Sequence, residues 1–204
     1  MCHWSPDGVH GFSPVDQRAA GELSTFCQEN DVSLLAYGSL CGAFLSDHWL
    51  GQPEPTDAEI TNWAKRKYYR FIKTAGDWQA LQDTLRALDG VAKKHAVSIS
   101  NVASRWVLDH RAVTAIIVGT RLGESEHRDD NLAVFDFELD ADDRVRIALA
   151  TGNQTPIPGD TGDAYRRAPF LTASGDLSHH LVLLPKVYAV CMSAICVLPP
   201  VGGA

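Results

Sequence analysis

Ala112-Val-Thr-Ala-Ile-Ile-Val118, closed by Gly119, is the stretch that decides the fold. It is apolar and rich in β-branched residues, which is typical of a strand buried on both faces. A second run of this kind, Val32-Ser-Leu-Leu-Ala-Tyr37, ends at Gly38-Ser39. The two runs predict two buried strands, each followed by a loop.

Helical patterns separate and flank these strands. Apolar residues recur at helical spacing from Trp78 to Ala92, and this helix is expected to end near His95. Ser98 is the expected N-cap of the next helix. Further helices are predicted over residues 18–30, from the end of strand 112–118 to near Phe135, and from an Asp140 N-cap through Ala150. Strands that alternate with helices predict parallel βα units, with strands 32–37 and 112–118 adjacent.

Composition bounds the class of protein. The chain has 204 residues, 45% of them apolar, and a net charge of -7 with a pI of about 5.5. This balance and the lack of an obvious Lys/Arg-rich stripe argue against nucleic acid as a partner. The five cysteines are odd in number and never spaced CxxC, which indicates reduced thiols in a cytoplasmic protein. Pro185 and Lys186 interrupt the apolar stretch 181–201, so no membrane span is expected.

Both predicted strands lead into segments that suit a phosphate. In an α/β fold, ligands bind at the carboxyl ends of the strands. Gly38 and Gly42 allow a close backbone approach, and Ser39 adds a hydroxyl. After the other strand, Arg121 can grip a phosphate with two N–H donors. The alternative to a phosphate site is that residues 38–42 form an ordinary turn and that Arg121 is a solvated surface charge.

Four segments in order resemble the aldo-keto reductase family. Tyr37-Gly-Ser-Leu-Cys-Gly resembles the stretch after the family's seventh strand, with Gly38 and Ser39 where Ser and Pro are usual. Ile117-Val-Gly-Thr-Arg121, followed by Asp130-Asn131, resembles the stretch after its eighth strand. The third segment resembles the helices that link the family's last strands and runs from Val91-Ala-Lys-Lys-His95 through Trp106-Val-Leu. The fourth segment resembles the stretch after the family's sixth strand and is Phe12-Ser-Pro-Val-Asp-Gln-Arg18.

The resemblance implies an α/β fold, the C-terminal portion of a (β/α)8 TIM barrel, incomplete and with an irregular C-terminal extension. Residues 1–150 would form the partial barrel, from about the sixth strand to the last helices, and residues 151–204 the extension. Residues 1–11 do not resemble the sixth strand. A closed barrel typically needs about 250 residues. We therefore expect open sheet edges that favour self-association, and a tail that leaves the sheet uncovered because it lacks the alternation of a strand.

The resemblance also implies an NADP(H) site. Tyr37 would stack near the nicotinamide, and Ser39, Leu40 and Gly42 would line the pyrophosphate. The 2′-phosphate would be held by Gly119, Thr120 and Arg121, and the adenine by Asp130 and Asn131.

The implied activity is reduction of an aldehyde or ketone to an alcohol, or the reverse, with a small carbonyl compound as the partner. The family's Asp, Tyr, Lys and His set comes from its first four strands, and no segment here resembles those motifs, so no catalytic residue is assigned. The spacing of His48, Lys65 and Tyr68 does not support them as substitutes, and the neighbours His179 and His180 point apart, which makes a poor metal site. The alternatives are a non-catalytic nucleotide-binding fragment and an inactive truncated product.

Overall fold

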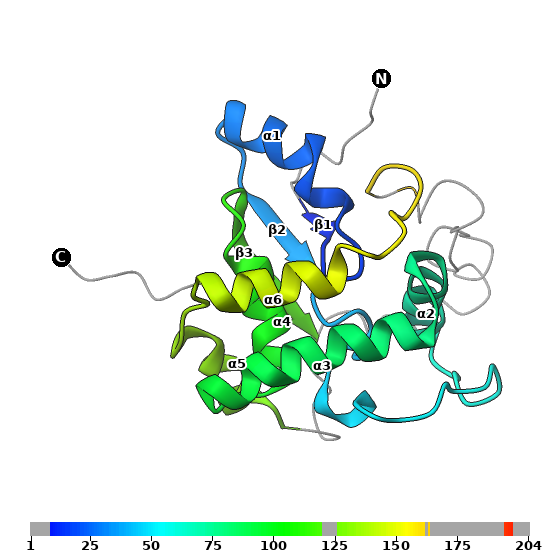
Figure 1. The fold of residues 1–204 in the computed structure, drawn as a ribbon. Coiled ribbons are helices and arrows are strands. Elements are labelled where there is room, and N and C mark those ends of the chain that lie inside the picture. Colours follow the sequence, from blue (N-terminus) through cyan, green and yellow to red (C-terminus); the bar gives the residue numbers. More distant parts are fainter. Residues whose placement is uncertain (1–8, 120–125, 162, 164–193, 198–204) are drawn as a thin grey trace.

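The computed structural model describes residues 9–119, 126–161, 163 and 194–197 (Figure 1). Its sheet has four strands in the order β1 (Val9–Gly11), β2 (Leu34–Tyr37), β3 (Val113–Gly119) and β4 (Ala194–Val197). The first three strands are parallel, and β4 lies antiparallel to β3. The prediction that β2 and β3 are adjacent and parallel is confirmed, with Tyr37 opposite Ile117.

The helices follow the predicted pattern closely. Ser98 and Asp140 cap α4 and α6, since each side chain accepts a hydrogen bond from a backbone N–H of the first turn. The segment predicted as one helix over residues 18–30 is a short 3-10 turn and then α1. The bounds are η1 Arg18–Ala20, α1 Glu22–Glu29, η2 Asp47–Trp49, α2 Trp63–Ala75, α3 Trp78–His95, α4 Ile99–Leu108, α5 Arg128–Leu132, η3 Ala133–Phe135 and α6 Ala141–Thr151.

Helices α1 and α4 cover one face of the parallel strands. The buried cluster there combines Leu34, Ala36 and Ile116 of the sheet with Leu23 of α1 and Val107 of α4. Burial alternates along β2, because Leu34 and Ala36 face this cluster while Leu35 and Tyr37 are half-buried on the other face. The inner face of these strands is therefore less covered than the outer face.

A second cluster lies among the helices, with α3 at its centre. Helix α3 runs beside α6, as Figure 1 shows, and also contacts α2 and α4. Its Leu85 and Leu88 are fully buried against Ile147 of α6 and Val102 of α4. Phe44, which follows the loop after β2, packs into the same cluster and ties that loop to the helices.

Three elements correct the sequence analysis. Residues 9–11, judged unlike the family's sixth strand, form β1 in parallel with β2. The tail, expected to leave the sheet uncovered, contributes β4, whose Cys196 pairs with Ile117 of β3. Helix α2 was not predicted at all. Strands β1 and β4 have only three and four residues. The position of such a short strand depends more on the strand that it pairs with than on its own apolar periodicity.

Within the part of the chain that the structure describes, no helix is both long and apolar enough to cross a bilayer.

Candidate functional site

The parallel sheet gathers the predicted ligand segments at one edge. Strands β1, β2 and β3 run in the same direction, so their carboxyl ends at Gly11, Tyr37 and Gly119 lie on the same side. The predicted pyrophosphate loop therefore starts beside the start of the predicted 2′-phosphate segment. Thr120 and Arg121 lie outside the described residues.

The loop after β2 has an unusual backbone. Gly38 and Gly42 have φ of 69° and 67°, and Cys41 and Ala43 also have positive φ, at 48° and 70°. Positive φ costs an L-residue about 1–3 kcal/mol unless the surroundings enforce it, and such strain gathers at ligand sites. One turn is closed by the Cys41 N–H, which donates to the Gly38 carbonyl at 2.8 Å. The loop thus has the positive-φ backbone expected of a phosphate cradle.

The predicted side chains of this loop differ in exposure. Ser39 is 2% exposed, so its hydroxyl points into the protein. Leu40 packs against the helical core cluster. Tyr37 is half-buried, and the Nζ of Lys67 lies 5.2 Å from the centroid of its ring. Tyr37 is therefore the predicted residue most directly placed at the strand edge, where it would stack on a flat ligand.

A small cavity opens at the carboxyl ends of β1 and β2. Its volume is about 10 Å³, close to the minimum that holds one water molecule. At its rim, Asp16 and Arg18 form a buried ion pair with an O–N distance of 2.8 Å. The residues that line the cavity are Gly11, Phe12, Ser13, Asp16, Arg18, Tyr37, Gly38, Lys67, Tyr68, Phe71 and Thr161.

Helix α2 brings to this cavity three residues that the sequence analysis did not assign to the site, Lys67, Tyr68 and Phe71. Lys67 is only 8% exposed, and its Nζ lies 5.4 Å from the ring centroid of Tyr68 and 5.8 Å from that of Phe71. A buried ammonium among aromatic rings is stabilised by their negative faces. The signal that sequence reasoning missed is the run of basic residues along α2, which the acidic average of the chain hides.

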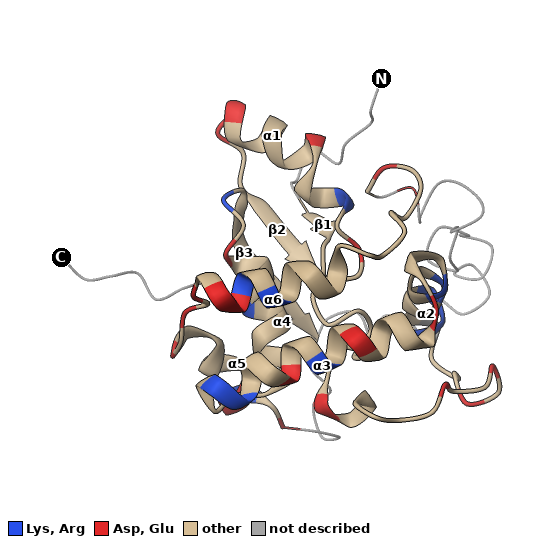
Figure 2. Ribbon diagram, viewed as in Figure 1, with Lys and Arg blue, Asp and Glu red and all other residues tan. Residues whose placement is uncertain are grey.

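That basic run corrects the view that no Lys/Arg-rich stripe exists. Figure 2 shows several blue residues close together on α2. The helix has five of the chain's 18 lysines and arginines and no acidic residue; the five are Lys65, Arg66, Lys67, Arg70 and Lys73. A local positive field is thus set beside the predicted phosphate loop in a chain whose net charge is -7.

The segments after β2 and β3 meet at the N-terminus of α4. Asp47 accepts a hydrogen bond from the Ile99 N–H at 3.2 Å. Asp130 accepts one from the Asn101 Nδ2 at 3.0 Å and one from the Ser98 hydroxyl at 3.3 Å. Carboxylates at this position complement the positive end of the helix dipole.

Asp130, predicted to bind adenine, is therefore already engaged in joining α5 to α4. Its neighbour Asn131 is half-buried, and its backbone N–H donates to the His127 carbonyl at 2.8 Å. Their contact with adenine stays a prediction.

Of the three residues rejected as catalytic substitutes, only Tyr68 reaches the cavity. Lys65 and His48 both lie against Trp49, with the Lys65 Nζ 5.5 Å from its ring centroid and the two ring centroids of His48 and Trp49 5.0 Å apart. Over the described ranges, no group of three or more His, Cys, Asp or Glu residues is placed to hold a metal ion.

Comparison with known proteins accounts for this arrangement. The family model of the aldo/keto reductases matches residues 9–150. The chain belongs to the aldo/keto reductase family. The match begins at β1 and ends within α6, so it covers the three parallel strands and the helices packed on them.

A solved aldo-keto reductase has the same fold over most of the described chain. The structure of the glycerol dehydrogenase AKR11B4 from Gluconobacter oxydans superposes with a TM-score of 0.57 at 17% identity, over 74% of this chain and 44% of that chain. The flagellar radial spoke protein 5 of Chlamydomonas reinhardtii is 31% identical over 96 residues, which are 45% of this chain and 18% of that protein. This chain thus spans less than half the length of either relative.

Proposed function

We propose that this chain is the cofactor-binding part of an NADP(H)-dependent aldo-keto reductase that interconverts aldehydes or ketones and alcohols in the cytoplasm. The observation that carries the proposal is the shared carboxyl edge of β2 and β3, where the positive-φ loop after Tyr37 lies beside Gly119. The glycerol dehydrogenase neighbour shares the fold over 74% of this chain. The cofactor supplies the hydride, and the chain's own residues would bind and orient it.

The chemistry of the edge fits a dinucleotide, although the conformation leaves little room for one. Tyr37 offers an aromatic face, the Gly38–Gly42 loop a backbone cradle, and α2 a positive field. The cavity of about 10 Å³ is too small for a dinucleotide, so side chains would have to move before a cofactor entered.

Cofactor choice tests the proposal. Arg121 is the residue expected to hold the 2′-phosphate that distinguishes NADP(H) from NAD(H). Its replacement by alanine should cost NADPH binding about 1.5–3 kcal/mol, the range for a hydrogen bond to a charged group, and should leave NADH binding nearly unchanged. Fluorescence titration of both cofactors against the chain and Arg121→Ala measures this. Equal NADPH and NADH affinities in both proteins would contradict it.

A second candidate, nucleotide binding without turnover, rests on the absence of the family's Asp, Tyr, Lys and His motifs from this sequence. The alkoxide formed by hydride transfer needs a proton, and a positioned general acid is worth about 10²–10⁴-fold in rate. We expect the purified chain to bind NADPH but not to oxidise it with a nitrobenzaldehyde. Steady oxidation above a heat-killed control would show that the chain has its own proton donor.

A further inference from the structure

Tyr68 lies over both glycines of the proposed phosphate loop. A Cβ placed on Gly38 would come within 2.1 Å of the Tyr68 hydroxyl oxygen, and one on Gly42 within 2.6 Å of its Cδ2. The phenol tip therefore touches the start of the loop, and the ring base touches its end. The glycines are needed here for two reasons, because the φ angles are positive and because the aromatic ring leaves no space for a side chain.

The position of Tyr68 explains why the cavity is so small. Tyr68 and Lys67 both line it, opposite the strand ends that supply Gly11 and Tyr37. The Lys67 ammonium lies near both tyrosine rings, at 5.2 Å from the centroid of Tyr37 and 5.4 Å from that of Tyr68. Consecutive residues of α2 thus cover the predicted nicotinamide end and the predicted pyrophosphate end of the site.

The body of α2 is anchored while Tyr68 is only partly enclosed. Phe71 and Ile72 are each 2% exposed in the helical core cluster, and the Asn62 side chain caps the helix through the Ala64 N–H at 2.8 Å. Tyr68 itself is half-buried. A rotation of one side chain about a fixed helix is therefore the smallest change that frees the loop.

We propose that Tyr68 is a gate: in the ligand-free chain its phenol fills the Gly38–Gly42 loop, and it must swing away before the nucleotide's phosphates can enter. The proposal rests on the proposed function. Once the phenol leaves, Lys67 of α2 remains at the cavity beside the vacated loop, where its positive charge would attract the anionic ligand. The closed state lowers the apparent affinity in proportion to the fraction of molecules that are open.

Two substitutions of Tyr68 distinguish the effect of its ring, which covers the loop, from the effect of its hydroxyl group. Tyr68→Leu keeps an apolar contact for Phe71 but is too short to reach Gly38. Tyr68→Phe is the matched control, because it keeps the ring over both glycines and removes only the hydroxyl. Each full-length variant is first checked for a cooperative thermal transition, and Tyr68→Met replaces Tyr68→Leu if the latter fails to fold. The measurements are NADPH affinity by fluorescence titration and amide hydrogen exchange of residues 38–42 without ligand.

We expect Tyr68→Leu to tighten NADPH binding by about tenfold, as a ligand-competent fraction of about one in ten predicts, and to speed exchange in the loop. Tyr68→Phe keeps the ring over both glycines, so it should stay closer to the parent chain than to Tyr68→Leu in both measurements. Equal NADPH affinities for the parent and Tyr68→Leu overturn the gate while leaving the proposed function intact. Unchanged exchange in Tyr68→Leu also overturns it. If residues 38–42 exchange faster in Tyr68→Leu but neither the parent nor any variant binds NADPH, the proposed function is refuted, while the finding that Tyr68 covers the loop is supported.

Discussion

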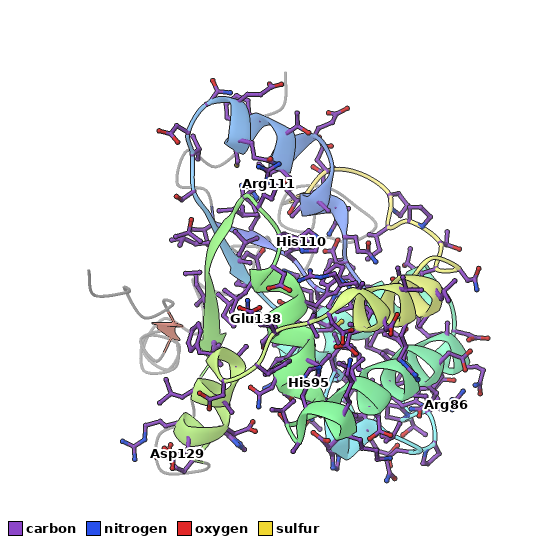
Figure 3. The ribbon with its side chains drawn as sticks, turned by 60° about the vertical axis from the view of Figure 1, so that its left-hand side comes forward. Arg86, His95, His110, Arg111, Asp129 and Glu138 are labelled. Carbon is purple, nitrogen blue, oxygen red and sulfur yellow. The ribbon has the colours of Figure 1, made fainter. Side chains whose placement is uncertain are left out.

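His110 lies at the turn from α4 into β3, where Figure 3 labels it. Its ring centroid is 4.4 Å from that of Trp106 and 4.6 Å from that of Phe12. Burial among these rings lowers the pKa of His110, and the hydrogen bond to the Trp106 carbonyl only partly offsets this effect. The structure therefore favours the neutral imidazole, with Nδ1 donating to that carbonyl at 2.9 Å.

A pH-dependent stability follows from the lowered pKa. The unfolded chain binds a proton at about pH 6.5, while the folded chain resists protonation to lower pH. The contribution of His110 is therefore fully present above about pH 6.5 and is lost as pH falls toward the folded pKa. We expect the Tm of the chain to fall between pH 7.5 and 5.5, and to fall less in His110→Asn, which retains a donor for the carbonyl. Identical pH slopes in thermal melts would contradict this.

Asp143 joins the start of α6 to the end of α3. It is 3% exposed, and its two oxygens lie 2.9 Å from the Lys94 Nζ and 2.7 Å from the Nε2 of His95, labelled in Figure 3. Burial alone would raise the pKa of Asp143, but the bonds from His95 and Lys94 hold it below its ordinary value. Asp143 also accepts a bond from the Asp140 N–H, which completes a capping box.

Replacing Asp143 by asparagine should lower the free energy of unfolding by about 1.5–3 kcal/mol, the range for a hydrogen bond to a charged group. Since the folded pKa is depressed, this stability is present above about pH 3.9 and is lost as pH falls through the folded value. Urea denaturation at pH 7 and pH 3 measures both effects, and the difference between parent and variant should shrink at pH 3. Asp142→Asn, exposed in the same helical turn, is the control and should change little. A similar loss in both variants would contradict the assignment.

The elements that could be predicted from the sequence are those with strong apolar periodicity. Strands β2 and β3 and helices α3, α4 and α6 have long apolar runs or stripes and recognisable caps, so local pattern and tertiary packing agree. Strands β1 and β4 have no such pattern, because a partner edge specifies them. At the site, the positions of Tyr37 and Gly119 follow from the strand ends. The covering of the loop by Tyr68 could not be predicted, because it depends on how α2 folds back over a distant segment.

The described sheet is not closed, because it has an edge strand on each side, β1 and β4. Among the described strands, β1 pairs only with β2 and β4 pairs only with β3, so the outer edge of each is unpaired. The inner face remains partly exposed, since Leu35, Tyr37 and Ile117 are only half-buried there. Unpaired backbone groups and apolar surface of more than a few hundred Å² favour association between chains.

We therefore expect the full chain to self-associate, and removal of β4 to increase the association. A chain that ends at residue 193 uncovers the edge of β3, while a chain that ends at residue 197 keeps β4 and serves as the control. Size-exclusion chromatography with light scattering should show larger species for the shorter chain and the same distribution for the control and the parent. If all three elute as monomers of about their own mass, 22.2 kDa for the parent, with sharp cooperative melts, the β1 edge is protected and the expectation is wrong. If only the shorter chain associates, pairing with β4 is sufficient to protect β3, and the outer edges of β1 and β4 contribute little because these strands have only three and four residues.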